Sequence, residues 1–216
     1  MSRSIVAILL AAGSGSRFGS DKLMHPLPDG TPIAVQSARN LKAALPHSRR
    51  IAVIRPGSGA LADALAAEAF EVVVCDNAAD GMGHSLAAGV DAAGRDGKRE
   101  SADDAGFVVA LADMPFITPS SIVAVGDSIV GGASLAAPTF EGRRGHPVGF
   151  SAIHRAALLG LTGDEGARRL ISSAGALMTL VAVDDPGVLR DIDTPEDLRL
   201  ATLAEGATQT TRPASS

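Results

Sequence analysis

Apolar and polar positions alternate in blocks that predict strands and helices in turn along the chain. Two runs, Ile5–Leu10 and Phe107–Leu111, are almost entirely apolar, as in parallel strands that are buried on both faces. Shorter apolar runs predict further strands at Arg50–Ile54, Glu71–Cys75, Ser134–Pro138, Val148–Phe150 and Leu177–Val183. Ala- and Leu-rich segments between turns predict helices at Ile33–Leu45, Gly59–Phe70, Met82–Ala93, Pro119–Val130, Ser151–Gly160, Gly166–Ala174 and Thr194–Ala204. This alternation predicts a single-domain α/β fold with a doubly wound, largely parallel sheet that binds ligands at the carboxyl ends of its strands.

Composition supports one aliphatic domain. Of the 216 residues 46% are hydrophobic but only 3% are aromatic, so the core must be built from Ala, Val, Leu and Ile. We expect one domain over residues 1–205, followed by a polar, disordered tail at 206–216.

The net charge and the absence of clear targeting signals disfavour nucleic-acid-binding, secreted and membrane proteins. The net charge is -5 and no dense Lys/Arg stripe occurs, which disfavours nucleic acid as a partner. The single cysteine, Cys75, allows no intramolecular disulfide and fits a reducing cytoplasm. No apolar stretch approaches the ~18–20 residues of a membrane span. The run from Ile5 to Ala12 after Arg3 loosely resembles a short signal peptide, but its length favours a buried strand. We therefore expect a cytoplasmic protein with no membrane association.

The segment after the first predicted strand, residues 10–22, is the strongest candidate for phosphate binding. It reads Leu-Ala-Ala-Gly-Ser-Gly-Ser-Arg-Phe-Gly-Ser-Asp-Lys. Its small residues let backbone N–H groups approach an anion, and Arg17 and Lys22 add positive charge. It is not a Walker A loop, because no Gly-Lys-Ser/Thr ends it, and Gly19 falls one position late for a dinucleotide fingerprint. The alternative is an ordinary glycine-rich turn.

Two later parts of the sequence carry carboxylates that are candidates for binding a metal ion. Asp113 follows the apolar strand Phe107–Leu111, at the end of a strand where α/β sheets bind ligands. One or two carboxylates suffice for Mg²⁺ when phosphate supplies other oxygens. The alternative for Asp113 is a cap of the turn into the next helix. Asp191 and Asp193 lie on the same side of an extended segment, so they could hold a metal or cap the helix that starts at Thr194.

These motifs, taken together, resemble nucleotidyltransferases of the MobA-like family, and most of all the molybdenum cofactor cytidylyltransferases (MocA-like). The resemblance rests on Leu-Ala-Ala-Gly-x-Gly-x-Arg-x-Gly with Lys22, on Leu-Ala-Asp-Met-Pro at Asp113, and on Asp-Ile-Asp-Thr-Pro-Glu-Asp-Leu from Asp191. It extends to Gly-Met-x-x-Ser-Leu from Gly81, Gly-Arg-x-Gly-His-Pro from Gly142 and Gly-Asp-x-Gly-Ala from Gly163. The Pro28–Pro32 stretch departs from the shorter Gly-Lys-Pro-Leu of many relatives.

The resemblance implies a role for each motif. The nucleotide would be bound by Leu10, Ala11, Ala12, Gly13, Gly15, Arg17, Lys22, Gly83 and Ser85. Arg17, Lys22 and Asp113 would be catalytic, Asp113 and Asp193 would hold Mg²⁺, and Asp191 would cap the following helix. The acceptor phosphate would contact Arg144, His146 and Asp164. Alanine at position 12, where guanylyltransferases tend to have a second glycine, indicates the cytidylyltransferase branch.

The implied reaction is transfer of CMP from Mg-CTP to the terminal phosphate of molybdopterin, with release of pyrophosphate. A phosphomonoester is largely ionised at neutral pH, since its second pKa is about 6, so a dedicated general base is unnecessary. CTP and a phosphorylated pterin are then the expected partners, with molybdoenzyme maturation proteins as further ones. Two alternatives stay open: a nucleotidyltransferase that uses GTP or another phosphorylated acceptor, and a non-catalytic accessory protein that binds the cofactor.

Overall fold

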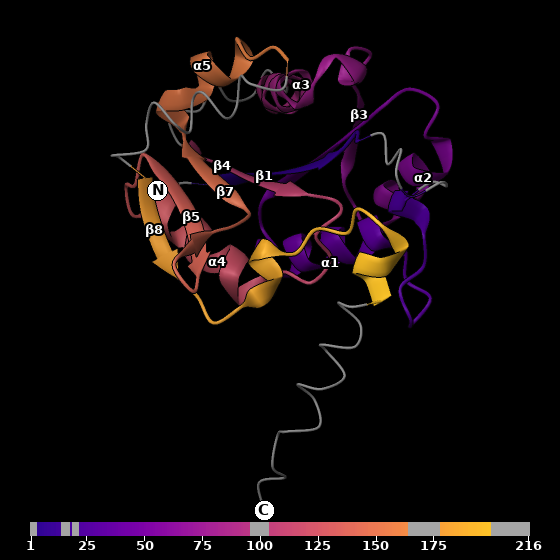
Figure 1. The fold of residues 1–216 in the computed structure, drawn as a ribbon. Coiled ribbons are helices and arrows are strands. Elements are labelled where there is room, and N and C mark those ends of the chain that lie inside the picture. Colours follow the sequence, from indigo (N-terminus) through magenta and orange to yellow (C-terminus); the bar gives the residue numbers. More distant parts are fainter. Residues whose placement is uncertain (1–3, 14–17, 19–21, 96–103, 164–177, 200–216) are drawn as a thin grey trace, which may run out of the picture.

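A mixed β-sheet forms the centre of the molecule (Figure 1). The computed structural model describes residues 4–13, 18, 22–95, 104–163 and 178–199, and within them the sheet has eight strands. They are β1 (Ser4–Ala11), β2 (Arg49–Ile54), β3 (Glu71–Val74), β4 (Asp104–Leu111), β5 (Leu135–Phe140), β6 (Arg143–Arg144), β7 (Val148–Ser151) and β8 (Met178–Ala182). Their order is β3-β2-β1-β4-β7-β5-β6, with β8 paired to β5.

The sheet is largely parallel, as the alternation of elements predicts. The strands β3, β2, β1 and β4 run parallel to one another, and β8 is parallel to β5. The exceptions are β7, which is antiparallel to both β4 and β5, and the two-residue β6, which is antiparallel to β5. The chain therefore turns back at residues 140–148, between β5 and β7.

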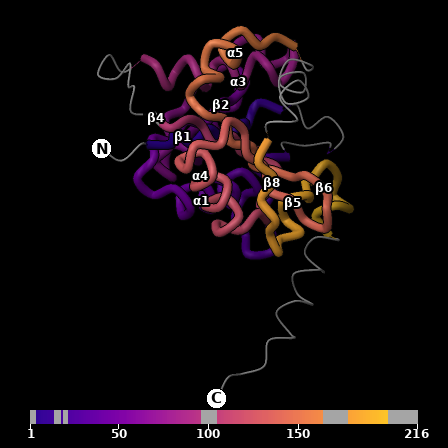
Figure 2. The backbone as a smooth tube through the Cα atoms, turned by 90° about the vertical axis from the view of Figure 1, so that its left-hand side faces the viewer, coloured from indigo at the N-terminus to yellow at the C-terminus, as the bar shows by residue number. Residues whose placement is uncertain are grey.

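Helices cover both faces of the sheet, which confirms the doubly wound arrangement. They are α1 (Ile33–Ala44), α2 (Gly59–Ala67), α3 (Met82–Gly94), α4 (Pro119–Val130) and α5 (Arg155–Leu159), with short 3-10 turns η1 (Lys22–Met24), η2 (Ala78–Asp80), η3 (Ala152–His154) and η5 (Pro186–Leu189). The helices α1, α2 and α4 lie on one side, whereas α3 and α5 lie on the other; Figure 2 shows α1 and α4 below the strands and α3 and α5 above them. The helix predicted from Thr194 is present at 195–199, and the helix predicted at Gly166–Ala174 and the tail 206–216 lie outside the described residues.

The two faces of β1 pack into two separate hydrophobic cores. Ile5, Ala7 and Leu9 pack with α1, α2 and α4, whereas Val6, Ile8 and Leu10 pack with α3 and α5. This is the period-two alternation of a strand that is covered on both sides, and it explains why the run is apolar at every position. The described helices contain none that is long and apolar enough to cross a lipid bilayer.

Helix α1 holds the loop that follows β4. The Ser37 hydroxyl donates to the backbone carbonyl of Ala112 at 2.9 Å. The Asn40 amide donates to the carbonyls of Pro115 and Ile117 at 2.8 and 2.9 Å. The loop that carries Asp113 is therefore tied to a packed helix on both sides of that residue.

A buried carboxylate, Asp185, joins η5 to the start of α4. It accepts hydrogen bonds from the Thr118 amide (2.9 Å), the Thr118 hydroxyl (2.8 Å), the Ser121 hydroxyl (2.7 Å) and the Gly187 amide (2.9 Å). The contact is close, because a Cβ on Gly187 would come within 2.1 Å of the Phe116 carbonyl oxygen. This junction places the segment that leads to Asp193 beside the β4–α4 loop.

Replacing Asp185 with Ala is expected to lower the free energy of unfolding by roughly 3 kcal/mol, because several donors around a buried charge would lose their acceptor. Urea denaturation measures this directly. The neighbouring Asp184 is exposed, so Asp184→Ala is the matched control and should change stability by less than about 0.5 kcal/mol. A loss below about 1 kcal/mol for Asp185→Ala would contradict the assigned role.

Candidate active site

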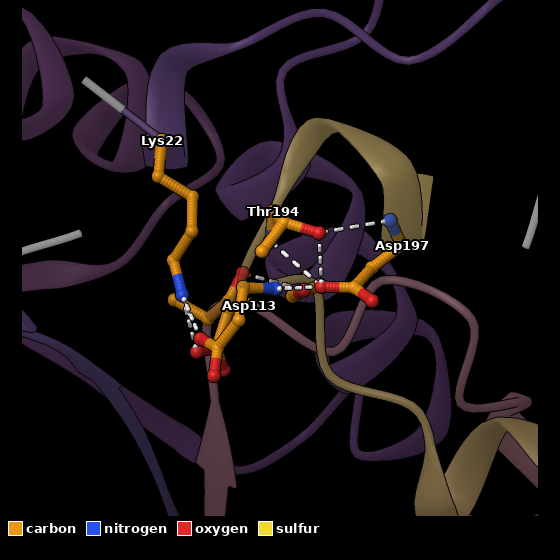
Figure 3. Close-up of polar contacts among 7 residues, drawn as sticks. Lys22, Asp113, Thr194 and Asp197 are labelled. Carbon is orange, nitrogen blue, oxygen red and sulfur yellow. Dashed lines mark hydrogen bonds and ion pairs between the residues drawn. The ribbon is translucent and has the colours of Figure 1, made fainter. Parts of the chain in front are cut away.

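Three charged side chains from distant parts of the sequence meet beyond the carboxyl ends of β1 and β4. The Lys22 ammonium lies 2.9 Å from Asp113 Oδ2 and 2.9 Å from Asp193 Oδ1. The Lys22 side chain is only 8% exposed, whereas the side chains of Asp113 and Asp193 are 25% and 47% exposed. Figure 3 shows the Lys22 side chain directed at Asp113, with Thr194 and Asp197 on the adjoining segment. Asp113 and Asp193 lie 91 and 171 positions after Lys22 in the sequence, yet the three side chains form one cluster.

The cluster keeps Lys22 charged. Burial by itself lowers the pKa of Lys22, but the charge of Asp113 and the hydrogen bonds to both carboxylates outweigh it, so the pKa lies above its ordinary value. Because the raised pKa favours the protonated form, the ammonium stays charged at neutral pH. The pKa of Asp191 is also raised, by loss of hydration and by the neighbouring negative charges of Asp193 and Asp113.

A backbone hydrogen bond to Asp113 and the cap of the following helix hold Asp193 in position. The Ile192 amide donates to the backbone carbonyl of Asp113 at 2.9 Å. Thr194 caps the following helix as expected, since its hydroxyl accepts from the Asp197 amide at 3.2 Å. The Asp197 carboxylate reaches back to the amides of Asp193 and Thr194 at 3.1 and 2.7 Å. The prediction that Asp191 provides the capping carboxylate is therefore wrong: Asp197 does, because its position on the first turn points it at these amides.

A cavity of about 580 Å³ opens beside the cluster. Six of the predicted site residues line it: Leu10, Ala12, Gly13, Lys22, Ser85 and Asp113. Its other walls come from the segments after β2 and β3 and from the start of α3: Arg55, Pro56, Asp76, Ala78, Ala79, Gly81 and Met82, with Leu23 and Leu111 beside the cluster. The cavity thus joins the charged cluster to the glycine-rich entry of α3.

The strand order determines the distance between the two ends of the cavity. The strands β4, β1, β2 and β3 are neighbours, so Asp113 and Asp76 are separated by three strand intervals of about 4.8 Å each. That span is long enough for an extended nucleotide. Arg55 and Asp76 were not predicted from the sequence, although each directly follows a predicted strand.

The two carboxylates fit a divalent metal. Asp113 and Asp193 both contact the Lys22 ammonium, so the two carboxylates converge on one cationic atom. The described residues contain no group of three or more His, Cys, Asp or Glu side chains that could hold a metal by themselves. Two carboxylates that are completed by water and phosphate oxygens are the arrangement that Mg²⁺ prefers.

Comparison with known proteins shows the family of this chain. A family model described as the MobA-like NTP transferase domain matches residues 7–178 of the chain. The chain belongs to this family. As a MobA-like NTP transferase it is a nucleotidyltransferase with a nucleotide substrate. The purine catabolism protein PucB of Bacillus subtilis (strain 168) is 32% identical over 205 residues, which cover 89% of this chain and 93% of PucB.

Solved structures show the same fold. Rv0371c from Mycobacterium tuberculosis H37Rv superposes with a TM-score of 0.76 at 25% identity, over 94% of this chain and 100% of that one. A further structure of Rv0371c is a complex with manganese. The molybdopterin-guanine dinucleotide biosynthesis protein A from Archaeoglobus fulgidus has a TM-score of 0.61 at 16% identity, over 94% of this chain and all of that one. The single-domain, mostly parallel α/β architecture is therefore confirmed.

Within this MobA-like fold the predicted nucleotide residues have different surroundings. Ser85 is buried at the cavity wall. The Gly83 amide donates to the Gly163 carbonyl at 2.9 Å, and a Cβ there would come within 2.6 Å of that oxygen, so Gly83 lets α3 approach the turn at Gly163. Ala11 is buried in the core rather than at the cavity. Gly15 and Arg17 lie outside the described residues.

Two of the predicted acceptor residues, Arg144 and His146, lie on the β5–β7 side. His146 Nδ1 is buried without a hydrogen-bond partner among the described residues, and the His146 amide donates to the Val188 carbonyl at 2.9 Å. Burial lowers the pKa of His146, the Asp113 carboxylate opposes this, and Arg144 adds to it. Arg144 is exposed on β6. Asp164 lies outside the described residues.

Proposed function

We propose that this MobA-like transferase moves CMP from CTP to the terminal phosphate of molybdopterin and releases pyrophosphate. The observation that carries the proposal is the convergence of Lys22, Asp113 and Asp193 beside a cavity that is lined by Leu10, Ala12 and Gly13. One cation and two carboxylates beside a small-residue loop are suited to phosphoryl chemistry, which depends on positioning and charge neutralisation.

In the proposed step, an oxygen of the acceptor phosphomonoester attacks the α-phosphorus of CTP. A new P–O bond forms, the bond from the α-phosphorus to the α,β-bridging oxygen breaks, and pyrophosphate leaves with the electron pair. Amides of the Leu10–Gly13 segment bind phosphate oxygens, and Lys22, with Arg17, stabilises the charge that develops on them. Mg²⁺ held by Asp113 and Asp193 would supply further charge neutralisation at the transferring group.

The nucleoside is expected towards β2 and β3. There Arg55 offers hydrogen-bond donors and Asp76 offers acceptors, and Ser85 lies at the wall. The choice of cytosine rests on Ala12, which lines the cavity in a motif that resembles the cytidylyltransferase branch. A pterin acceptor is supported by that resemblance and by the name of the Archaeoglobus fulgidus neighbour.

The acceptor phosphate is expected at Arg144, His146 and Asp164. His146 supports this placement for two reasons. Its buried Nδ1 has no hydrogen-bond partner among the described residues, and its ring interacts electrostatically with the Asp113 carboxylate. A ligand phosphate there would lie on the opposite side of Asp113 from the nucleotide cavity, since β7 and β2 flank the β1–β4 pair on opposite sides.

Pyrophosphate release with Mg²⁺ and molybdopterin tests the proposal, with CTP, GTP, ATP and UTP compared as donors and acceptor-free reactions as controls. We expect turnover with CTP at least about tenfold above the other donors, because a base edge is discriminated by hydrogen bonds worth about 1–3 kcal/mol. Preferential turnover of GTP would keep the mechanism and overturn the argument from Ala12. Absence of pyrophosphate with every donor would exclude molybdopterin as the acceptor.

A further inference from the structure

We propose that Lys22 takes the place of the divalent metal while the nucleotide is absent. Its ammonium holds Asp113 and Asp193 together and weakens their affinity for free metal, and an incoming triphosphate draws Lys22 away. Metal and nucleotide then bind with positive coupling. This inference rests on the proposed metal site at Asp113 and Asp193.

The position of the ammonium supports the first half of the proposal. Lys22 Nζ contacts one oxygen of each carboxylate, at 2.9 Å in both cases. Asp113 and Asp193 are also the residues that would hold Mg²⁺, which prefers one or two carboxylates together with phosphate oxygens and water. The ammonium and the metal therefore compete for the same pair of carboxylates, and the lysine neutralises one of the two negative charges that would attract the metal.

Burial makes this competition effective. The Lys22 side chain is 8% exposed, less than that of either aspartate, so water screens its two ion pairs only partly. The carboxylates come from two separate segments, one that follows β4 and one that precedes the 195–199 helix. Without a cation between them, their mutual repulsion would favour separation. Lys22 thus keeps the pair assembled but partly neutralised.

The cavity lets an incoming triphosphate reach Lys22 and draw it away from the two carboxylates. Lys22 and Asp113 both line it, together with Leu10, Ala12 and Gly13 of the segment that is proposed to bind the triphosphate. A lysine ammonium is a point charge on a flexible four-carbon stem, so it can turn from carboxylates to phosphate oxygens without backbone movement. Because coupling between two ligands is reciprocal, the factor by which nucleotide raises metal affinity equals the factor by which metal raises nucleotide affinity.

Binding of Mn²⁺ to the nucleotide-free protein tests the proposal without measuring turnover. Free Mn²⁺ is quantified by electron paramagnetic resonance for the wild type and for Lys22→Met, which keeps an unbranched side chain and removes the charge. We expect Lys22→Met to bind Mn²⁺ at least about tenfold more tightly, because a unit positive charge next to the site is removed. Lys42→Met is the matched control, since Lys42 pairs with Glu68 at 3.3 Å on a different surface, and it should match the wild type.

Calorimetry with α,β-methylene-CTP tests the coupling. Mn²⁺ should raise the affinity of this analogue in the wild type by a larger factor than in Lys22→Met. Equal factors, or Mn²⁺ affinities of Lys22→Met at or below the wild-type value, would overturn the inference. Lys22→Gln serves as the second variant where circular dichroism shows that Lys22→Met does not fold.

Asp113→Asn separates the inference from the proposed function. If it removes Mn²⁺ binding while Lys22→Met leaves nucleotide-free binding unchanged, the metal site stands and only the role of Lys22 falls. If Asp113→Asn leaves Mn²⁺ binding unchanged, the proposed metal site itself is wrong, and the inference falls with it.

Discussion

Replacing Asp113 with Asn should lower kcat for nucleotidyl transfer by about 10³-fold or more, because a neutral amide is a poor ligand for a divalent metal that stabilises several kcal/mol of transition-state charge. The fold should survive the change. The backbone of Asp113 is held independently of its side chain, through the Ile192 amide and through the bond from Ser37 to the adjacent Ala112. Steady-state pyrophosphate release across a Mg²⁺ titration measures the effect.

The matched control is Asp127→Asn, the same chemical change at an exposed position on α4. Its rate should equal that of the wild type at every Mg²⁺ concentration, and chelation of the metal should abolish the activity of both proteins. Near-normal turnover of Asp113→Asn at saturating Mg²⁺ would show that Asp113 does not hold the catalytic metal.

Replacing Lys22 with Ala should lower kcat by about 10²–10³-fold and weaken nucleotide binding much less, by under about tenfold. The raised pKa of Lys22 keeps its ammonium charged, and that charge is most valuable where negative charge builds up on the transferring group. Single-turnover rates and the dissociation constant of α,β-methylene-CTP separate the two effects.

Two comparisons sharpen this test. Lys42→Ala removes a lysine of the Glu68 ion pair outside the site and should leave kcat unchanged. Lys22→Arg restores charge with a wider, planar group that does not reproduce the two 2.9 Å contacts, so only partial recovery is expected. An unchanged kcat for Lys22→Ala would refute its proposed role in transfer, whatever its effect on metal affinity.

Most of the secondary structure could be predicted from the sequence, because its signals are local. Helix α4 occupies Pro119–Val130 as predicted, since proline favours the first turn and the apolar positions that follow recur at helical spacing. The completely apolar run of β1 indicated burial on both faces, and both faces do pack against helices. The antiparallel direction of β7 was not predictable in this way, because strand periodicity is the same in both directions.

The site was predictable only in part, for a related reason. Asp113 could be found because it lies just beyond the end of an apolar strand, and the same rule applied to Arg55 and Asp76 would have found two more lining residues. The contact of Lys22 with Asp193 could not, because nothing local links positions 171 residues apart. The capping role of Asp197 rather than Asp191 was likewise decided by the direction in which the helix begins.

The sequence by itself therefore determined the elements, their alternation, the aliphatic core and the residue types suited to phosphate and metal chemistry. These depend on periodicity, turn residues and the end of each strand, which all act over a few positions. Only the tertiary structure decided which charges meet. The neighbouring order of β4, β1, β2 and β3 and the return of the chain to Asp193 place one buried ammonium between two carboxylates. That placement depends on how the two cores pack around the sheet, and no local pattern encodes it.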